Sequence, residues 1–139
     1  MNARGGGRFT AYSAGSHPSG TVRPEALREF EAAGISAGGF RSKSWDEFAK
    51  PDSPTMGFIF TVCDNAAYET CPVWPGHPAT SHWGVPDPAA VRGTEEEIQR
   101  AFHEAFVTLD RRIKIFLSLP LDSIDGLDLR RKLDNIGRP

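Results

Sequence analysis

The sequence predicts a single α/β domain, residues 1–139, in which helices flank a parallel β-sheet, and three observations support this prediction. Candidate strands and helices alternate along the chain. The segment from Met56 to Val62 is an apolar run rich in β-forming residues, as a strand buried on both faces would be. The segment from Thr94 to Leu119 has the apolar periodicity of a long helix with one buried face.

The amino-terminal part of the chain is expected to contain a strand, a helix and a short helical turn. The alternating segment Arg8–Ser13 carries aromatic residues, which is typical of a strand. Pro24 suits the first turn of a helix, and Gly34 suits its end. The segment Ser44–Glu47 has the spacing of a capping box and predicts a short helical turn.

The carboxyl-terminal part is expected to contain a second strand and two helices. Thr80–Val85 is a weaker strand candidate than Met56–Val62. Thr94 and Glu97 form a capping box at the start of the long helix, which Pro120 should stop. A last amphipathic stretch should end at Gly137. The apolar positions of the long helix recur at helical spacing: Ile98, Phe102, Ala105, Phe106, Leu109, Ile113, Phe116 and Leu117.

Charge and composition restrict the expected partners and location. The formal net charge is −2 and the isoelectric point is near 6.1, which gives no reason to expect binding to nucleic acid or to an anionic membrane. No apolar run is long enough to span a bilayer, and the first residues lack the apolar core of a secretory signal. We therefore expect a cytoplasmic protein whose two cysteines are reduced at rest, so that a disulfide between them would be catalytic or regulatory.

The two cysteines are candidates for redox chemistry. Cys63 follows the buried strand and precedes a plausible helix start, where a helix N-terminus favours the thiolate. Cys71 lies eight positions later. A helix between them would separate their Cα atoms by about 12 Å, whereas a disulfide needs roughly 7 Å or less. A bond between them requires a looped or melting segment, as in a redox switch. The alternative is two unrelated thiols, and spacing alone does not decide between these.

Zinc binding is a competing hypothesis, and an aspartate is a further candidate. Cys63, Cys71, His77 and His82 offer thiolate and imidazole ligands within a short span, but structural zinc sites usually pair cysteines at closer spacing.

Asp87 lies between two prolines and is a candidate proton donor on a rigid loop. An ordinary turn aspartate is the favoured explanation for such a tripeptide taken by itself.

Four separated motifs resemble, in order, those of bacterial arsenate reductases with the low-molecular-weight tyrosine phosphatase fold. They are Ala11–Pro18, Arg41–Phe48, Thr61–Gly76 and His82–Ala89. The resemblance extends from about Gly5 to the carboxyl end. It implies a three-layer α/β fold with a parallel sheet flanked by helices, and an arsenate or phosphate-like oxyanion as the substrate.

The resemblance also implies a chemistry. In such enzymes a Cys-x5-Arg loop after the first strand binds the oxyanion, and its cysteine attacks arsenic. A second cysteine displaces arsenite by forming a disulfide, and a third takes over that disulfide and presents it to thioredoxin. Cys63 matches the second cysteine and Cys71 the third. Asp87 matches the aspartate that is the general acid in the phosphatase relatives. No cofactor and no metal are implied.

The sequence departs from this pattern in one respect. Glu69 stands six positions after Cys63 and His77 six positions after Cys71, so the sequence contains no Cys-x5-Arg. We expect that the first strand and its oxyanion loop are missing through a late start assignment, and that Met1–Arg4 ends the helix after them. This loss would leave two strand edges unpaired. The alternatives are a tyrosine-phosphatase-like hydrolase and a non-catalytic redox or zinc-binding module.

Overall fold

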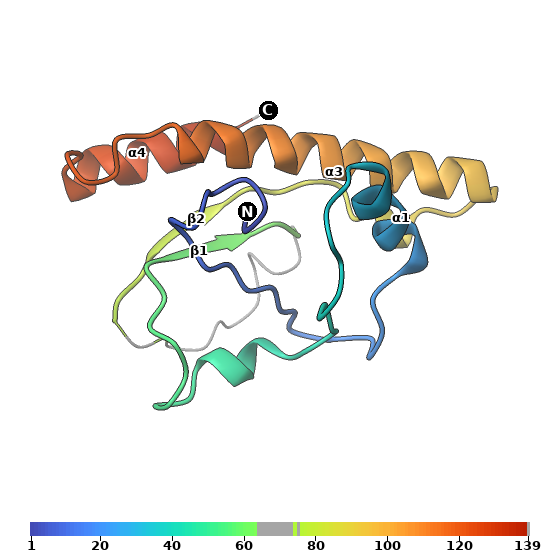
Figure 1. Cartoon of the computed structure of the whole chain (residues 1–139), viewed down its shortest axis with the longest axis horizontal. Coiled ribbons are helices and arrows are strands. Elements are labelled where there is room, and N and C mark those ends of the chain that lie inside the picture. Colours follow the sequence, from blue (N-terminus) through green and yellow to red (C-terminus); the bar gives the residue numbers. More distant parts are fainter. Residues whose placement is uncertain (64–73, 75, 139) are drawn as a thin grey trace.

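The computed structural model describes residues 1–63, 74 and 76–138 and has the α/β character that the sequence predicts (Figure 1). Two strands, three α-helices and two 3-10 helices are assigned in these residues. In chain order they are α1 (Pro24–Ala32), η1 (Trp45–Phe48), β1 (Phe58–Thr61), β2 (Ala79–His82), η2 (Pro88–Ala90), α3 (Glu95–Leu117) and α4 (Gly126–Ile136).

The two strands are parallel and share one continuous register. Phe58 pairs with Ala79 at one end, and Thr61 pairs with His82 at the other. Figure 1 shows α3 and α4 on one side of the strands and the segment around η1 on the opposite side. A parallel pair needs a crossover connection, which here runs through residues 62–78 and includes Cys71, outside the described residues.

Local sequence explains where the two carboxyl-terminal helices begin and end. The Thr94 hydroxyl accepts a hydrogen bond from Glu97 N–H (3.1 Å), so the predicted N-cap of the capping box is confirmed, and the Glu97 carboxylate contacts the Thr94 hydroxyl (3.2 Å). α3 ends at Leu117, shortly before Pro120, as predicted. The Asp125 carboxylate caps α4 by accepting from Asp128 N–H (2.9 Å). Within the described residues, no helix combines the length and the apolar character needed to cross a membrane.

The hydrophobic core lies between the strands and the two carboxyl-terminal helices. Trp83, Phe116 and Leu133 are almost completely buried there. Phe60 stacks on Trp83 with ring centroids 3.9 Å apart, and Phe58 meets the Phe116 ring edge-on at 5.1 Å. The Trp83 indole N–H donates to the Leu133 carbonyl oxygen (3.0 Å), so the largest core side chain is both packed and hydrogen-bonded.

The predicted strand at Arg8–Ser13 is wrong in this structure. The backbone of Ala11 forms its hydrogen bonds with the Asn2 side chain and not with another strand. Ala11 N–H donates to Asn2 Oδ1 (2.7 Å), and Asn2 Nδ2 donates to the Ala11 oxygen (3.1 Å). The nearest regular pairing is an isolated parallel bridge between Gly15 and Ser44. The segment is extended without belonging to a sheet.

The two predicted strands and the helical turn between residues 44 and 85 agree with the sequence in type and differ in length or position. The strand predicted at Met56–Val62 is the shorter β1, and the one predicted at Thr80–Val85 lies slightly earlier as β2. Ser44 caps the 3-10 helix η1 as expected, but its hydroxyl accepts from Asp46 N–H (3.2 Å), and the Glu47 carboxylate binds Arg41, so a capping box with Glu47 is not formed. Strand ends are set by the partner available at each residue, which the sequence of one strand does not reveal.

Candidate functional site

A cavity of about 970 Å³ runs along β1, on the side where the chain is mostly coil. All four of the sequence motifs described above contribute to its lining. Tyr12 comes from the first motif, Trp45 from the second, Cys63 from the third and Asp87 from the fourth. Segments that are far apart in the chain therefore meet around one space, which makes this cavity the candidate site.

The lining of the cavity includes β1 with the residues that flank it, and the segment 8–17. Among the described residues, β1 pairs with β2 alone, so its other edge has no strand beside it. The Gly15–Ser44 bridge joins the first motif to the second. Trp74, at the end of the third motif, meets Trp45 edge-on at 6.0 Å and ties that motif to η1.

Cys63 lies just beyond β1, where the strand pairing changes register. The hydrogen bond that Trp83 N–H donates to the Thr61 oxygen (2.7 Å) still follows the register that pairs Phe58 with Ala79 and Thr61 with His82. The next bond in that register would join Val85 to Cys63, but Val85 N–H instead donates to the Val62 oxygen (2.9 Å). Such a one-residue shift is bulge-like, and bulges redirect side chains next to functional sites. Cys63 is thus the first residue beyond the paired strand, and it is half-buried in the cavity lining.

Asp87 is exposed at the start of η2, and its side chain has a defined orientation. Its carboxylate accepts a hydrogen bond from Ala89 N–H (2.9 Å) and thereby caps η2. This contact confirms a turn role for Asp87 and is compatible with a second role, because the residue also lines the cavity.

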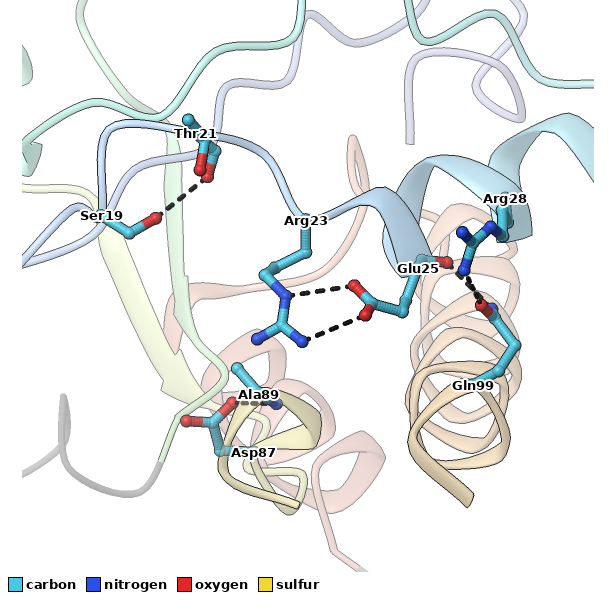
Figure 2. Close-up of polar contacts among 8 residues, drawn as sticks. All are labelled: Ser19, Thr21, Arg23, Glu25, Arg28, Asp87, Ala89 and Gln99. Atoms are coloured by element: carbon cyan, nitrogen blue, oxygen red, sulfur yellow. Dashed lines mark hydrogen bonds and ion pairs between the residues drawn. The ribbon is translucent and has the colours of Figure 1, made fainter. Parts of the chain in front are cut away.

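Arg23 is a charged neighbour of Asp87 that sequence reasoning missed. Figure 2 shows its side chain extending from the start of α1 toward the loop that carries Asp87. Its guanidinium donates twice to Glu25 (3.1 and 3.2 Å) and stands 5.3 Å from the Phe102 ring centroid. The hydrogen bond to Glu25 raises the pKa of Arg23 against the effect of burial, the charge of Glu25 adds to this, and the charge of Asp87 makes the smallest contribution. This side chain is a cation beside the loop. No pattern in the sequence indicated that these segments meet.

Of the four candidate zinc ligands, Cys63, His77 and His82 lie within the described residues. Cys71 lies outside them, so its placement beside Cys63 is not described. Among the described residues, no group of three or more metal-binding side chains is close enough to hold an ion. His82 Nδ1 is hydrogen-bonded to the Thr61 hydroxyl (2.6 Å), a contact that follows from the strand register. His77 is exposed.

Comparisons with known proteins agree with the four motifs. Residues 1–126 match the family described as "Low molecular weight phosphotyrosine protein phosphatase". The chain is 34% identical to an arsenate reductase of Bacillus licheniformis over 112 residues, which cover 80% of this chain and 76% of the relative. It is 32% identical to arsenate reductases of Oceanobacillus iheyensis and Bacillus subtilis over 111 residues, with the same coverage.

Proposed function

We propose that this chain, which belongs to the low molecular weight phosphotyrosine protein phosphatase family, is an arsenate reductase that works by a disulfide relay. The observation that carries the proposal is the convergence of all four motifs on one cavity, with Cys63 and Asp87 both in its lining. The similar proteins described above are arsenate reductases, which favours arsenate over a phosphate ester as the substrate.

In the proposed reaction, a thiolate attacks arsenic(V) and displaces an arsenate oxygen, which takes up protons and leaves as water, so that a sulfur–arsenic adduct forms. The Cys63 thiolate then attacks the sulfur of that adduct. A disulfide forms, the sulfur–arsenic bond breaks with its electron pair on arsenic, and arsenite departs. Cys71 next attacks Cys63, so the first thiol is released and a Cys63–Cys71 disulfide remains. The dithiol of thioredoxin reduces this disulfide and becomes oxidised in turn.

The first thiolate is assigned to a Cys-x5-Arg loop, which the printed sequence does not contain. We place this loop, and the strand that leads into it, on a segment encoded ahead of Met1. The cavity supports this placement because β1, which has no strand beside its second edge among the described residues, contributes to its lining. A strand in that position would pair with β1 and would end near Cys63, at the carboxyl edge of a parallel sheet, where ligands of α/β proteins bind.

Cys63 suits the second thiol because of its place in the strand. The register shift at Val62 leaves it directly beyond the paired part of β1 while the preceding residues are held by β2. A nucleophile needs such anchoring, because reacting atoms must be held within a few tenths of an ångström of a productive geometry. Asp87 suits proton donation to a leaving oxygen, and this donation matters most when the leaving group is the alkoxide or phenoxide of an ester.

The test is an assay of the protein translated with the coding sequence upstream of Met1, beside the chain as printed. With arsenate and thioredoxin, the longer protein should turn over and the printed chain should stay at the blank. Cys63→Ser should block arsenite release, whereas Cys71→Ser should release one arsenite per enzyme and then stop. Recycling by thioredoxin that survives both cysteine changes would refute the relay.

The phosphatase alternative is tested on the same proteins with p-nitrophenyl phosphate. Hydrolysis should survive both cysteine changes and should fall by about 10²-fold or more in Asp87→Asn, because that change removes a general acid. Efficient ester hydrolysis without any arsenate reduction would replace the proposal by the hydrolase function.

A further inference from the structure

Arg112 is a buried cation in α3 that the proposed chemistry does not use. Only 4% of the residue is exposed. Its Nη1 donates to the Trp83 oxygen (2.7 Å) and to the Gly84 oxygen (3.1 Å). In the part of the chain that the structure describes, its Nε is buried without a hydrogen-bond partner, and no carboxylate forms an ion pair with it. The cation is therefore held by two backbone carbonyls.

Such a residue is costly for a structural purpose alone. Burial, followed by the nearby charge of Arg111, lowers the pKa of Arg112, but a guanidinium remains charged in proteins. An apolar side chain of similar volume often seals a core equally well or better than a buried charge does. The position of the two accepting carbonyls indicates what the charge contributes.

The two carbonyls belong to the segment that sets the register beside Cys63. The peptide group between Gly84 and Val85 is bonded on both sides, since its oxygen accepts from Arg112 and its N–H donates to the Val62 oxygen (2.9 Å). The Val62 oxygen is in turn part of the peptide group whose N–H belongs to Cys63. Two consecutive peptide groups therefore connect the guanidinium of Arg112 to the backbone of Cys63.

A cation at one end of such a chain strengthens every bond in it. A charged donor polarises the carbonyl that accepts from it, and the N–H of the same amide becomes a better donor. The bond from Val85 to Val62 is the one that departs from the regular register of the strands. Arg112 thus acts where the pairing of β1 ends and Cys63 begins.

We propose that Arg112 is a positioning residue for Cys63, because it pins the Gly84–Val85 peptide group that holds Val62 in the shifted register. The proposal rests on the proposed function only in that Cys63 is the thiol that must be placed. The same contacts also hold the chain three residues before Asp87, so both candidate groups depend on one side chain of α3.

The test uses the printed chain with Cys71→Ser, so that Cys63 is the single thiol. Arg112→Met removes the charge and the nitrogen that donates both hydrogen bonds, Arg112→Lys keeps the charge on a shorter side chain, and Arg111→Gln is the matched control on the exposed side of α3. Amide hydrogen exchange of Val85 should accelerate at least tenfold relative to that of Phe60 in Arg112→Met and at least threefold in Arg112→Lys. Iodoacetamide should alkylate Cys63 at least threefold faster in both, because the half-buried thiol is released.

The ratio of exchange rates separates positioning from general destabilisation, because global unfolding would accelerate Val85 and Phe60 together. Arg111→Gln should leave the ratio and the alkylation rate within twofold of the parent. If Arg112→Met does not fold, the exchange ratio and the alkylation rate of Arg112→Lys provide the test. An unchanged ratio and alkylation rate in a folded Arg112 variant would overturn the proposal. These readouts need no arsenate turnover, so failure of the proposed function and failure of this inference are distinguishable.

Discussion

The two sides of β1 differ in how they are covered, although they belong to the same four residues. Phe58 and Phe60 point toward α3 and α4 and join the buried cluster around Trp83 and Phe116. Alternate residues of a strand point to opposite faces, so Thr61 faces the other way, and it lines the cavity together with Cys63. The sealed side of the strand, which carries Phe58 and Phe60, is packed by aromatic rings, although Phe58, Phe60 and Phe116 also reach the lining of the cavity. The other side, which carries Thr61, faces a part of the cavity that is lined mainly by coil segments.

The difference separates the scaffold from the candidate site. On the sealed side, regular helices with capped ends hold the strands in place. On the cavity side, the lining comes mainly from coil segments, which are anchored by single contacts such as the Gly15–Ser44 bridge. Substitutions on the sealed side should therefore reduce stability, whereas substitutions in the cavity should alter chemistry with little effect on stability.

The largest effect on stability is expected from Phe116→Ala. The Phe116 side chain is completely buried and contacts the rings of Phe9, Phe58 and Phe60. Its removal leaves a cavity and should lower the free energy of unfolding by about 3–5 kcal/mol. Urea denaturation measures this change, with Phe116→Leu as the milder variant if the alanine protein does not fold. Cys63→Ser, on the cavity side, should change the free energy of unfolding by less than about 1 kcal/mol. Equal losses in both variants would show that the two sides of β1 do not differ in their contribution to stability.

A smaller loss is expected from Gly137→Ala, at the end of α4. A Cβ atom there would lie 2.5 Å from the His82 oxygen and 2.7 Å from a Trp83 ring carbon, so helix and strand would have to separate. Such overpacking should cost about 1–3 kcal/mol. The matched control is Gly126→Ala at the other end of the same helix, where an added Cβ meets no atom within 4 Å. Thermal denaturation should show a loss only in the first variant, and similar melting temperatures would mean that α4 does not pack closely on β2.

The smallest effect on stability is expected at Asp110. Its carboxylate pairs with Arg4 of the amino-terminal turn (3.0 Å) and with Lys114 one turn later in α3 (3.0 Å). Burial alone would raise the pKa of Asp110, but hydrogen bonds from Lys114 and Arg4 outweigh it and hold that pKa below its ordinary value. The carboxylate therefore stabilises the fold fully above about pH 4, which is the pKa of an aspartate in the unfolded chain. This contribution disappears as the pH falls through the lower pKa of Asp110 in the folded protein. Because both cations are partly exposed, the contribution at pH 7 should be about 1 kcal/mol or less.

The measurement is the difference in unfolding free energy between the parent and Asp110→Asn as a function of pH. The difference should be present at pH 7 and absent near pH 2. A difference that stayed constant over this range would show that the ion pairs do not supply it.

Sequence patterns predicted the sealed side well, because its elements have strong local signals. The capping box at Thr94 and the apolar periodicity up to Leu117 determine α3 almost without reference to the rest of the chain. Strand lengths were predicted less well, and the strand at Arg8–Ser13 was wrong, because a strand needs a partner and this segment bonds to the Asn2 side chain. Local alternation of residues contains no information about that partner.

The candidate site was predictable in its residues but not in its surroundings. Motif resemblance identified Cys63 and Asp87, and the structure brings both to one cavity. The approach of Arg23 to Asp87 and the contacts of Arg112 depend on how α1 and α3 pack, which no motif specifies. In the sequence, Arg112 stands beside Arg111 and resembles any other surface charge of a long helix.

The most direct test of the account is whether Cys63 and Cys71 form a disulfide with each other. The printed chain is oxidised with a small excess of hydrogen peroxide, which converts two thiols and one peroxide into one disulfide and two waters. Peptide mapping then identifies the linked residues, and hydrogen exchange over residues 63–71 compares the two redox states. We expect an intramolecular Cys63–Cys71 bond that thioredoxin reduces, together with faster hydrogen exchange in that segment after oxidation. A folded protein in which the two thiols never link, or in which stoichiometric zinc holds both and protects them from peroxide, would contradict it.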